Sequence, residues 1–194
     1  MGFLSVLSQA QRWVKERVKP GDAVVDATAG NGSDTLFLAR TVGSGGIVYA
    51  FDIQNEALEN TRRRLDAAEV SEAGRLAEVT LVHAGHETMD DAVASDLHGR
   101  IAAVMFNLGY LPGASSTVIT EPATTLSALD SALRLLRGGG VLTAVVYPGH
   151  EGGQVEADAV QAWASGISLS VAQTVIYRFP QKTVSPYLIA LIKR

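Results

Sequence analysis

A glycine turn beside a short apolar run is the first stretch of this sequence that could do chemistry. Gly30 and Gly32 follow the run Ala23–Val25 and precede a helical pattern that begins near Thr35. Because glycines lack Cβ atoms, they let backbone N–H groups and a helix N-terminus come close to the polar groups of a ligand. The pattern predicts a nucleotide-like ligand, although two glycines after a strand also occur in ordinary tight turns.

An acidic residue supports the ligand-binding interpretation. Asp52 stands 20 positions after Gly32, at the end of the apolar run Ile47–Phe51, where a carboxylate can accept both hydroxyls of a ribose. Thr35 replaces the third glycine of the dinucleotide-binding fingerprint, so the pattern is incomplete for NAD. Together with Asp26, these features resemble the S-adenosylmethionine site of class I methyltransferases.

The segment Asn107–Gly113 could hold a methyl acceptor. It follows the apolar run Ile101–Phe106. A carboxamide oxygen and a backbone carbonyl can bind an amine while the ring of Tyr110 packs against the planar part of a substrate. The amine lone pair is then free to face a methyl donor. The alternative is structural, with Asn107 as a turn former and Tyr110 as a packed residue at the rim.

Histidines follow two other predicted strands. His150 lies in the glycine-rich segment Tyr147–Gly153, and His86 follows a third apolar run. An imidazole titrates in a range that suits orienting or deprotonating a substrate, although such a histidine is usually just exposed. A metal site from His83, His86, Glu87 and His150 has suitable ligand types. Methyl transfer accounts for every one of these segments and a metal only for some, so no metal is expected.

The composition excludes several classes of protein. The chain of 194 residues is 47% hydrophobic and 19% charged, and no apolar run approaches the about 18 residues of a membrane span. The absence of cysteine excludes disulfides, thiolate metal sites and cysteine nucleophiles. A net charge of −4 argues against a strongly basic protein that coats nucleic acid, but leaves a local RNA-binding patch open. The N-terminus lacks the apolar centre of a secretory signal, so a cytoplasmic location is predicted.

Strand and helix patterns alternate along the chain. Strands are predicted over residues 23–25, 47–51, 79–82, 101–106, 141–146, 168–179 and 187–192. Helices are predicted from Phe3 to Val18, over 53–68, over about 89–97, from Pro122 to the glycines 138–140, and over 155–163. This alternation predicts an α/β fold with a doubly wound, mostly parallel, seven-stranded sheet and an N-terminal helix, in a single domain spanning residues 1–194.

The ordered segments also point to a family. With Asp26–Thr35, Phe51–Gln54, Phe106–Gly113 and Tyr147–Gly153 in sequence, the chain resembles the methyltransferase family long labelled putative rRNA methylase. The similarity covers nearly the whole chain, and Asn-Leu-Gly-Tyr-Leu-Pro-Gly is its most specific part. The resemblance implies a Rossmann-like class I fold and S-adenosyl-L-methionine as cofactor. Members of the MnmM type methylate the 5-aminomethyl group of the wobble 2-thiouridine of tRNA, which implies the tRNA anticodon region as partner.

The resemblance assigns roles to residues of this sequence. The catalytic residues expected are Asn107, Tyr110 and His150. The cofactor-binding residues expected are Asp26, Thr28, Gly30, Asn31, Gly32, Asp34, Thr35, Asp52, Ile53, Gln54, His86 and Asn107. The substrate-binding residues expected are Leu108, Gly109, Tyr110, Pro112, Tyr147 and His150. No membrane contact is expected, and the oligomeric state stays open, with a homodimer as one alternative.

The expected mechanism needs mainly positioning. The sulfonium methyl is already activated, so placing donor and nucleophile in line can supply about 7–11 kcal/mol. A primary alkylamine is largely protonated at neutral pH, so some group must take its proton, and His150 or His86 could assist. The alternatives are a methyltransferase that acts on rRNA or a small molecule, and a non-catalytic nucleotide-binding module.

Overall fold

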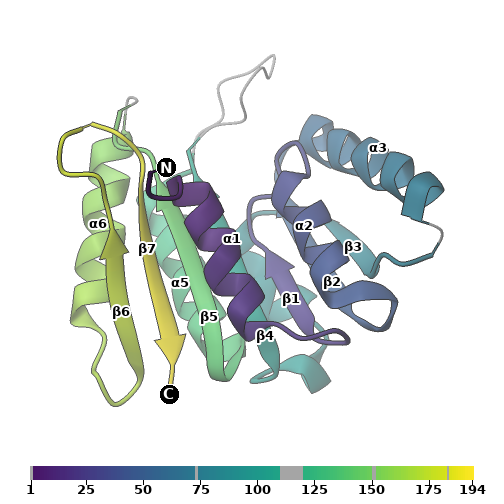
Figure 1. Ribbon diagram of the computed structural model, residues 1–194. Coiled ribbons are helices and arrows are strands. Elements are labelled where there is room, and N and C mark those ends of the chain that lie inside the picture. The colour runs from purple at the N-terminus through teal and green to yellow at the C-terminus, as the bar shows by residue number, and fades with distance from the viewer. Residues whose placement is uncertain (1, 73, 110–119, 150–151, 183) are drawn as a thin grey trace.

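The computed structural model describes residues 2–72, 74–109, 120–149, 152–182 and 184–194, which form a central sheet with helices on both sides (Figure 1). The strands are β1 Ala23–Asp26, β2 Ile47–Asp52, β3 Glu78–His83, β4 Ile101–Leu108, β5 Leu136–Val146, β6 Ala172–Tyr177 and β7 Tyr187–Lys193. The α-helices are α1 Val6–Arg17, α2 Ser33–Val42, α3 Asn55–Glu72, α4 Met89–Ala92, α5 Pro122–Leu135 and α6 Gly153–Gly166.

The strands form one sheet in the order β3-β2-β1-β4-β5-β7-β6. Strands β1 to β5 run parallel, whereas β7 pairs antiparallel with β5 and with β6. The strand order reverses between β1 and β4, and ligands of doubly wound sheets bind in the crevice beyond the carboxyl ends at such a point. The predicted seven-stranded, mostly parallel, doubly wound sheet is confirmed.

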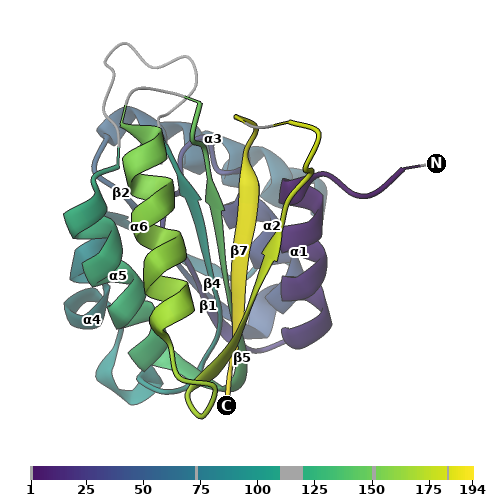
Figure 2. The same cartoon turned by 90° about the vertical axis from the view of Figure 1, so that its left-hand side faces the viewer.

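Successive residues of the inner strands face opposite helix layers. Val24 of β1 belongs to a core cluster with Val14 of α1 and Leu38 of α2. Its neighbour Val25 belongs to a second cluster with Leu129 of α5. Figure 2 shows these layers on opposite sides of the sheet, with α5 and α6 on one side and α1 on the other. Because both faces are covered, the inner strands appear in the sequence as continuous apolar runs.

The prediction for the end of α5 is wrong. The helix was expected to stop at glycines 138–140, but it ends at Leu135 and these glycines lie inside β5. Leu136 already pairs with Ile101 of β4, and the register of the two strands then shifts. Gly139 has a φ of +76°, which favours glycine. The glycines therefore serve an irregular strand segment and not a helix C-cap.

Other predicted elements differ at their ends. Helix α1 begins after Ser5, whose hydroxyl caps it by accepting from the backbone N–H of Ser8. Phe3 therefore lies outside the helix, and it is 87% exposed. The helix predicted over 89–97 is divided into α4 and a separate 3-10 turn, Ser95–Leu97. The strand predicted over 168–179 is shorter and corresponds to β6. Within the described ranges, none of the helices has the length and apolar character to cross a membrane.

Gly32 lies where the start of α2 meets α3. It is buried with a φ of +76°, and a Cβ at this position would lie 2.8 Å from the Cα of Thr61. Ordinary Cβ contacts are longer than this, so the two helices could not keep their present separation. Close packing against α3 is therefore the structural reason for glycine at this position.

We expect Gly32→Ala to lower the free energy of unfolding by about 2–4 kcal/mol, because it combines backbone strain with overpacking. Gly139→Ala is the matched control, since Gly139 has the same φ of +76° but no atom lies within 4 Å of its added Cβ. The control should lose only the backbone part, about 1–2 kcal/mol. Denaturant unfolding of both variants measures the difference, and equal losses would show that the contact with Thr61 carries no energy.

Candidate active site

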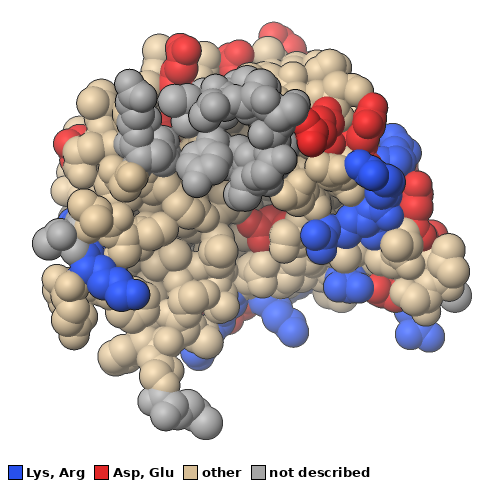
Figure 3. All heavy atoms as spheres, turned by 90° about the horizontal axis from the view of Figure 1, so that it is seen from above, with Lys and Arg blue, Asp and Glu red and all other residues tan. Residues whose placement is uncertain are grey.

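A cavity of about 630 Å³ lies beyond the carboxyl ends of β1, β2 and β4 and extends to residues that follow β3 and β5. Figure 3 looks down on this edge of the sheet. The expected site residues that line it are Thr28, Gly30, Asn31, Asp34, Asp52, Ile53, Gln54, His86, Asn107, Gly109 and Tyr147. Segments far apart in the sequence are therefore brought to one place.

Some expected site residues are not among those that line the cavity. Asp26, Gly32, Thr35 and Leu108 are buried behind its wall. Tyr110, Pro112 and His150 lie outside the described residues, so the roles expected for them stay predictions. Asp26 and Thr35 act on the site through hydrogen bonds, and Gly32 acts through its packing against α3.

Asp52 and the glycine turn hold each other in place. Asp52 Oδ2 accepts from the backbone N–H of Gly30 at 3.0 Å, and Oδ1 accepts from the backbone N–H of Gln54 at 2.9 Å. Each carboxylate oxygen can accept a further hydrogen bond, and the side chain is only partly buried at the cavity. This geometry leaves Asp52 able to accept two vicinal hydroxyls.

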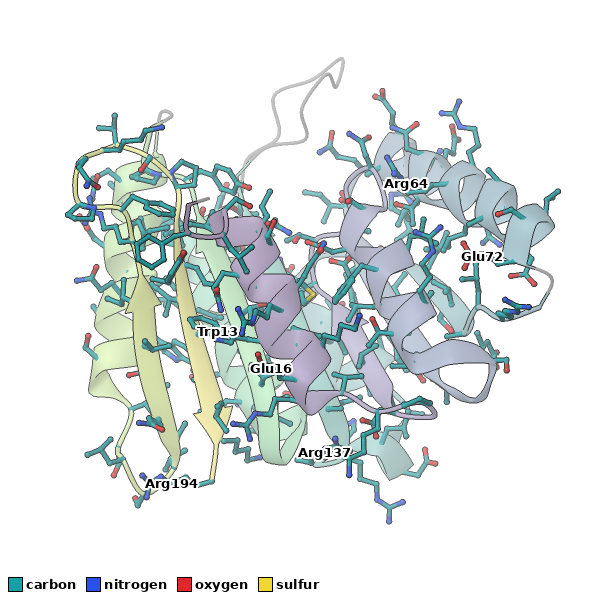
Figure 4. All side chains as sticks on the ribbon, viewed as in Figure 1. Trp13, Glu16, Arg64, Glu72, Arg137 and Arg194 are labelled. Carbon is teal, nitrogen blue, oxygen red and sulfur yellow. The ribbon has the colours of Figure 1, made fainter. Side chains whose placement is uncertain are left out.

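Helix α3 fixes the tip of the turn. Asn60 Nδ2 donates to Asn31 Oδ1 at 3.0 Å, and Arg64 Nε donates to the backbone carbonyl of Asn31 at 2.7 Å. Figure 4 shows Arg64 on α3, next to the start of α2. Of the three consecutive arginines on α3, Arg64 bonds the turn directly, and Arg63 donates to Asn60 Oδ1.

Asp26 is a fully buried carboxylate at the end of β1. Its oxygens accept from Thr35 Oγ1 at 2.6 Å and from the backbone N–H of Thr28 at 3.1 Å. Burial, and next the negative charge of Asp34, raise the pKa of Asp26 to about 7. Thr35, which stands in place of the third fingerprint glycine, thus joins α2 to β1.

Asn107, near the end of β4, has a side-chain oxygen without a hydrogen-bond partner among the described residues. Its backbone N–H donates to Thr28 Oγ1 at 2.7 Å, and its Nδ2 donates to Asp34 Oδ2 at 2.5 Å. Its Oδ1 is buried and has no hydrogen-bond partner in the part of the chain that the structure describes. A buried oxygen without a donor costs about 1–3 kcal/mol, so its presence at a cavity wall favours a ligand that supplies an N–H or O–H.

Asp34 receives hydrogen bonds from two other elements. Besides Asn107, Gln11 of α1 donates through Nε2 to Asp34 Oδ1 at 2.7 Å. Asp34 is only 7% exposed. Both Gln11 and Leu7 of α1 line the cavity, so the leading helix is part of the site. The only sign in the sequence is the four-residue spacing of Leu7 and Gln11, which places a polar residue beside the apolar stripe.

His86 is buried at the cavity and packs edge-on against Phe106, with ring centroids 5.7 Å apart. Burial is the largest influence on its pKa, which lies below the usual value, so the imidazole is neutral at neutral pH.

The expected absence of a metal is not tested by this structure. Among the residues that the structure describes, no group of three or more histidine and acidic side chains is placed to hold an ion.

Tyr147, which follows β5, is partly buried and lines the same cavity. Burial, and next the negative charge of Asp34, raise the pKa of its phenol. The ring therefore stays neutral at ordinary pH. It offers the cavity an apolar face and a hydroxyl that can donate or accept.

Glu156 of α6 is a site-shaping residue that the sequence analysis missed. It is 3% exposed, and its carboxylate accepts from Thr120 Oγ1 at 2.6 Å and from Thr125 Oγ1 at 2.7 Å. Thr120 lines the cavity, and its backbone N–H donates to the carbonyl of Gly109 at 3.1 Å. The spacing of Glu156 from Gly153 and Val160 places it on the buried face of α6, which is the signal that could have found it.

Comparisons with known proteins agree with this fold. The family model described as "Putative rRNA methylase" matches residues 48–193. The chain belongs to this family. A solved structure of the same description from Clostridium thermocellum is 37% identical with a TM-score of 0.91, and each chain is covered completely. A methyltransferase structure from Streptococcus mutans in complex with SAH is 33% identical with a TM-score of 0.86, again with complete coverage of both chains.

A curated relative carries a more specific name. The chain is 41% identical over 182 residues to the Arabidopsis thaliana protein named tRNA (mnm(5)s(2)U34)-methyltransferase, chloroplastic. The match covers 91% of this chain and 65% of that protein. The chain therefore spans about two thirds of the length of this relative.

We expect Asp26 to make stability depend on pH. The pKa of Asp26 is about 7 in the folded chain and near 3.8 when unfolded, so Asp26 keeps its proton up to a higher pH in the folded state. Its contribution is fully present below pH 3.8 and is lost as the pH rises through about 7, with a slope of at most about 1.4 kcal/mol per pH unit.

Asp26→Asn should remove this slope, because an amide does not titrate in this range. Urea unfolding of wild type and variant between pH 4 and 8 measures it, with exposed Asp96→Asn as the control substitution. Parallel pH profiles for wild type and Asp26→Asn would show that the pKa of Asp26 is not raised in the folded protein.

Proposed function

We propose that this chain is an S-adenosylmethionine-dependent methyltransferase, a single domain spanning residues 1–194, which methylates an amine on RNA. The acceptor we propose is the 5-aminomethyl group of the wobble 2-thiouridine of tRNA. The observation that carries the amine is the Oδ1 of Asn107, which is buried without a hydrogen-bond partner among the described residues, on a side chain that lines the cavity. The name of the Arabidopsis relative supports the choice of tRNA.

The cavity has groups that suit the cofactor. Asp52 would accept the ribose hydroxyls, and the backbone around Gly30 would face the polar end of the molecule. Ile53 and His86 offer apolar and aromatic surface for the adenine. When bound, S-adenosylmethionine supplies a methyl group on a positively charged sulfur, and SAH is the same molecule after that methyl has left. The SAH complex of the Streptococcus mutans relative supports this assignment.

The charge of the cavity favours cationic ligands. The charged side chains that line it in the described ranges are the carboxylates Asp34, Asp52, Glu87 and Glu121, apart from the titratable His86. A positive sulfonium and a protonated amine are both attracted to such a surface. RNA phosphates are repelled from it, so only the modified group would enter while the backbone stays at the rim.

The reaction needs an oriented, neutral amine. Asn107 Oδ1 accepts one N–H of the amine, which turns the nitrogen and leaves its lone pair for the methyl group. The ammonium form must first lose a proton. Burial lowers the pKa of His86, so its imidazole is neutral but a weak base, and removal of water from around the amine must do most to favour the neutral amine.

The outer surface supports an RNA partner. Arg62 and Arg63 are exposed on α3, and Arg63 donates to Asn60, the residue that bonds Asn31. Figure 3 shows a group of Lys and Arg atoms on the α3 side of the edge where the cavity opens. Unpaired anticodon bases can leave their stack and enter a pocket more easily than bases of a duplex. A homodimer and a cytoplasmic location stay predictions.

Asp52→Ala should weaken S-adenosylmethionine binding by about 1.5–3 kcal/mol, the range for hydrogen bonds to a charged group. Titration calorimetry measures the change, and thermal unfolding checks that the variant is folded. The control is Asp66→Ala, because Asp66 is an exposed residue of α3. NAD should not bind, since Thr35 stands in place of the third fingerprint glycine. Unchanged affinity in Asp52→Ala, or binding of NAD, would contradict the cofactor assignment.

The acceptor is tested with tRNA that carries the unmethylated 5-aminomethyl nucleoside. Incubation with S-adenosylmethionine and the protein should add one methyl group to that nucleoside, as read by mass analysis of the digested tRNA. Asn107→Ala should abolish this gain while cofactor affinity stays nearly constant, because the lost contact belongs to the acceptor. Methylation of ribosomal RNA alone, or of a free amine alone, would overturn the tRNA assignment and leave a methyltransferase with another substrate.

A further inference from the structure

The orientation of the Asn107 amide is decided by its neighbour. A carboxylate oxygen has no hydrogen to donate. The Asn107 atom that faces Asp34 Oδ2 must therefore be the nitrogen. The oxygen is then forced to the opposite side, where it is buried without a partner in the described part of the chain. Asp34 thus selects which end of the amide a ligand meets.

Asp34 is itself held by α1. Gln11 Nε2 donates to Asp34 Oδ1 at 2.7 Å, so each carboxylate oxygen has a donor from a different element. The chain Gln11–Asp34–Asn107 therefore crosses from α1 through the start of α2 to the end of β4. All three residues line the cavity, and Asp34 is 7% exposed.

We propose that Asp34 and Gln11 are positioning residues, which fix Asn107 with its oxygen toward the acceptor. They thereby select acceptors that bring an N–H to this point. This inference rests on the proposed amine acceptor, and it gives Asp34 a role other than holding the cofactor. An acceptor atom without a hydrogen, such as an alkoxide, would meet a repulsive oxygen instead.

Asp34→Asn should reverse the amide of Asn107. The oxygen of the new amide at position 34 stays with the Gln11 donor, so its nitrogen faces Asn107. Two facing NH₂ groups repel, and Asn107 turns its oxygen to position 34 and its nitrogen to the cavity. We expect acceptor turnover at saturating S-adenosylmethionine to fall by about 10- to 100-fold.

A second substitution should restore the pair. Asn107→Asp alone places two carboxylates against each other and should also be inactive. In the double variant Asp34→Asn/Asn107→Asp, the amide at 34 donates to one oxygen at 107, and the other oxygen again faces the cavity. Turnover should recover by about tenfold or more over either single variant. If Asp34 serves only the cofactor, Asp34→Asn weakens cofactor binding and the double variant shows no recovery, which overturns the proposal.

Gln11→Ala tests the outer end of the chain. It should lower kcat with the amine acceptor several-fold and leave cofactor affinity unchanged. Gln154→Ala is the matched control. Gln154 Nε2 donates to Asp158 Oδ1 at 2.8 Å on the exposed face of α6, and Gln154 is not among the residues that line the cavity. Equal kcat for wild type and Gln11→Ala would remove Gln11 from the proposal.

A measurement without substrate separates this inference from the proposed function. The side-chain NH₂ of Asn107, identified in nitrogen-15 spectra by its loss in Asn107→Asp, should exchange slowly with water in the wild type because it is bonded to Asp34. Exchange should become faster in Asp34→Asn. An unchanged rate would overturn the positioning role whatever the acceptor proves to be, whereas faster exchange in a protein that methylates no amine would overturn only the proposed function.

Discussion

Two neighbouring buried carboxylates, Asp26 and Asp34, are the constraint on which the site depends. A buried charge is costly unless it is hydrogen-bonded, so each carboxylate must collect donors from the elements around it. Asp26 takes them from Thr28 and Thr35, and Asp34 takes them from Gln11 and Asn107. These bonds join β1, α2, α1 and β4 at the crevice where the strand order reverses.

The same constraint carries an energetic conflict. Two carboxylates close together in a dry environment cannot both ionise freely. The raised pKa of Asp26 means that this carboxyl group keeps its proton to a higher pH than usual. Asp34 lines the cavity, while Asp26 behind the wall holds a proton up to about pH 7. A fold selected only for stability would place apolar side chains here, so this pair is more readily explained by the needs of a cationic ligand.

The fold and the cavity wall could be predicted because they depend on local patterns. Continuous apolar runs predicted the inner strands, and polar residues directly after them predicted Asp52, His86 and Asn107 at one edge. Gln11 and Glu156 do not directly follow strands but lie on helices, where spacing can place a polar residue on a buried face but does not identify its partner. Gly32 shows a different limit: the sequence indicated that a glycine was needed, but only the packing of Thr61 shows why.

The choice between a dinucleotide and S-adenosylmethionine follows from charge as well as from the glycine pattern. A pyrophosphate needs a surface of positive potential, which backbone N–H groups at a helix N-terminus and nearby cations supply. Here Asp34 stands in the first turn of α2, and lysine and arginine are absent from the described residues that line the cavity. A dianionic group would meet carboxylates at this helix end, whereas a sulfonium and an amine would be attracted to them. The residue that orients Asn107 therefore also makes this crevice unsuitable for the ligand that its glycine turn superficially suggests.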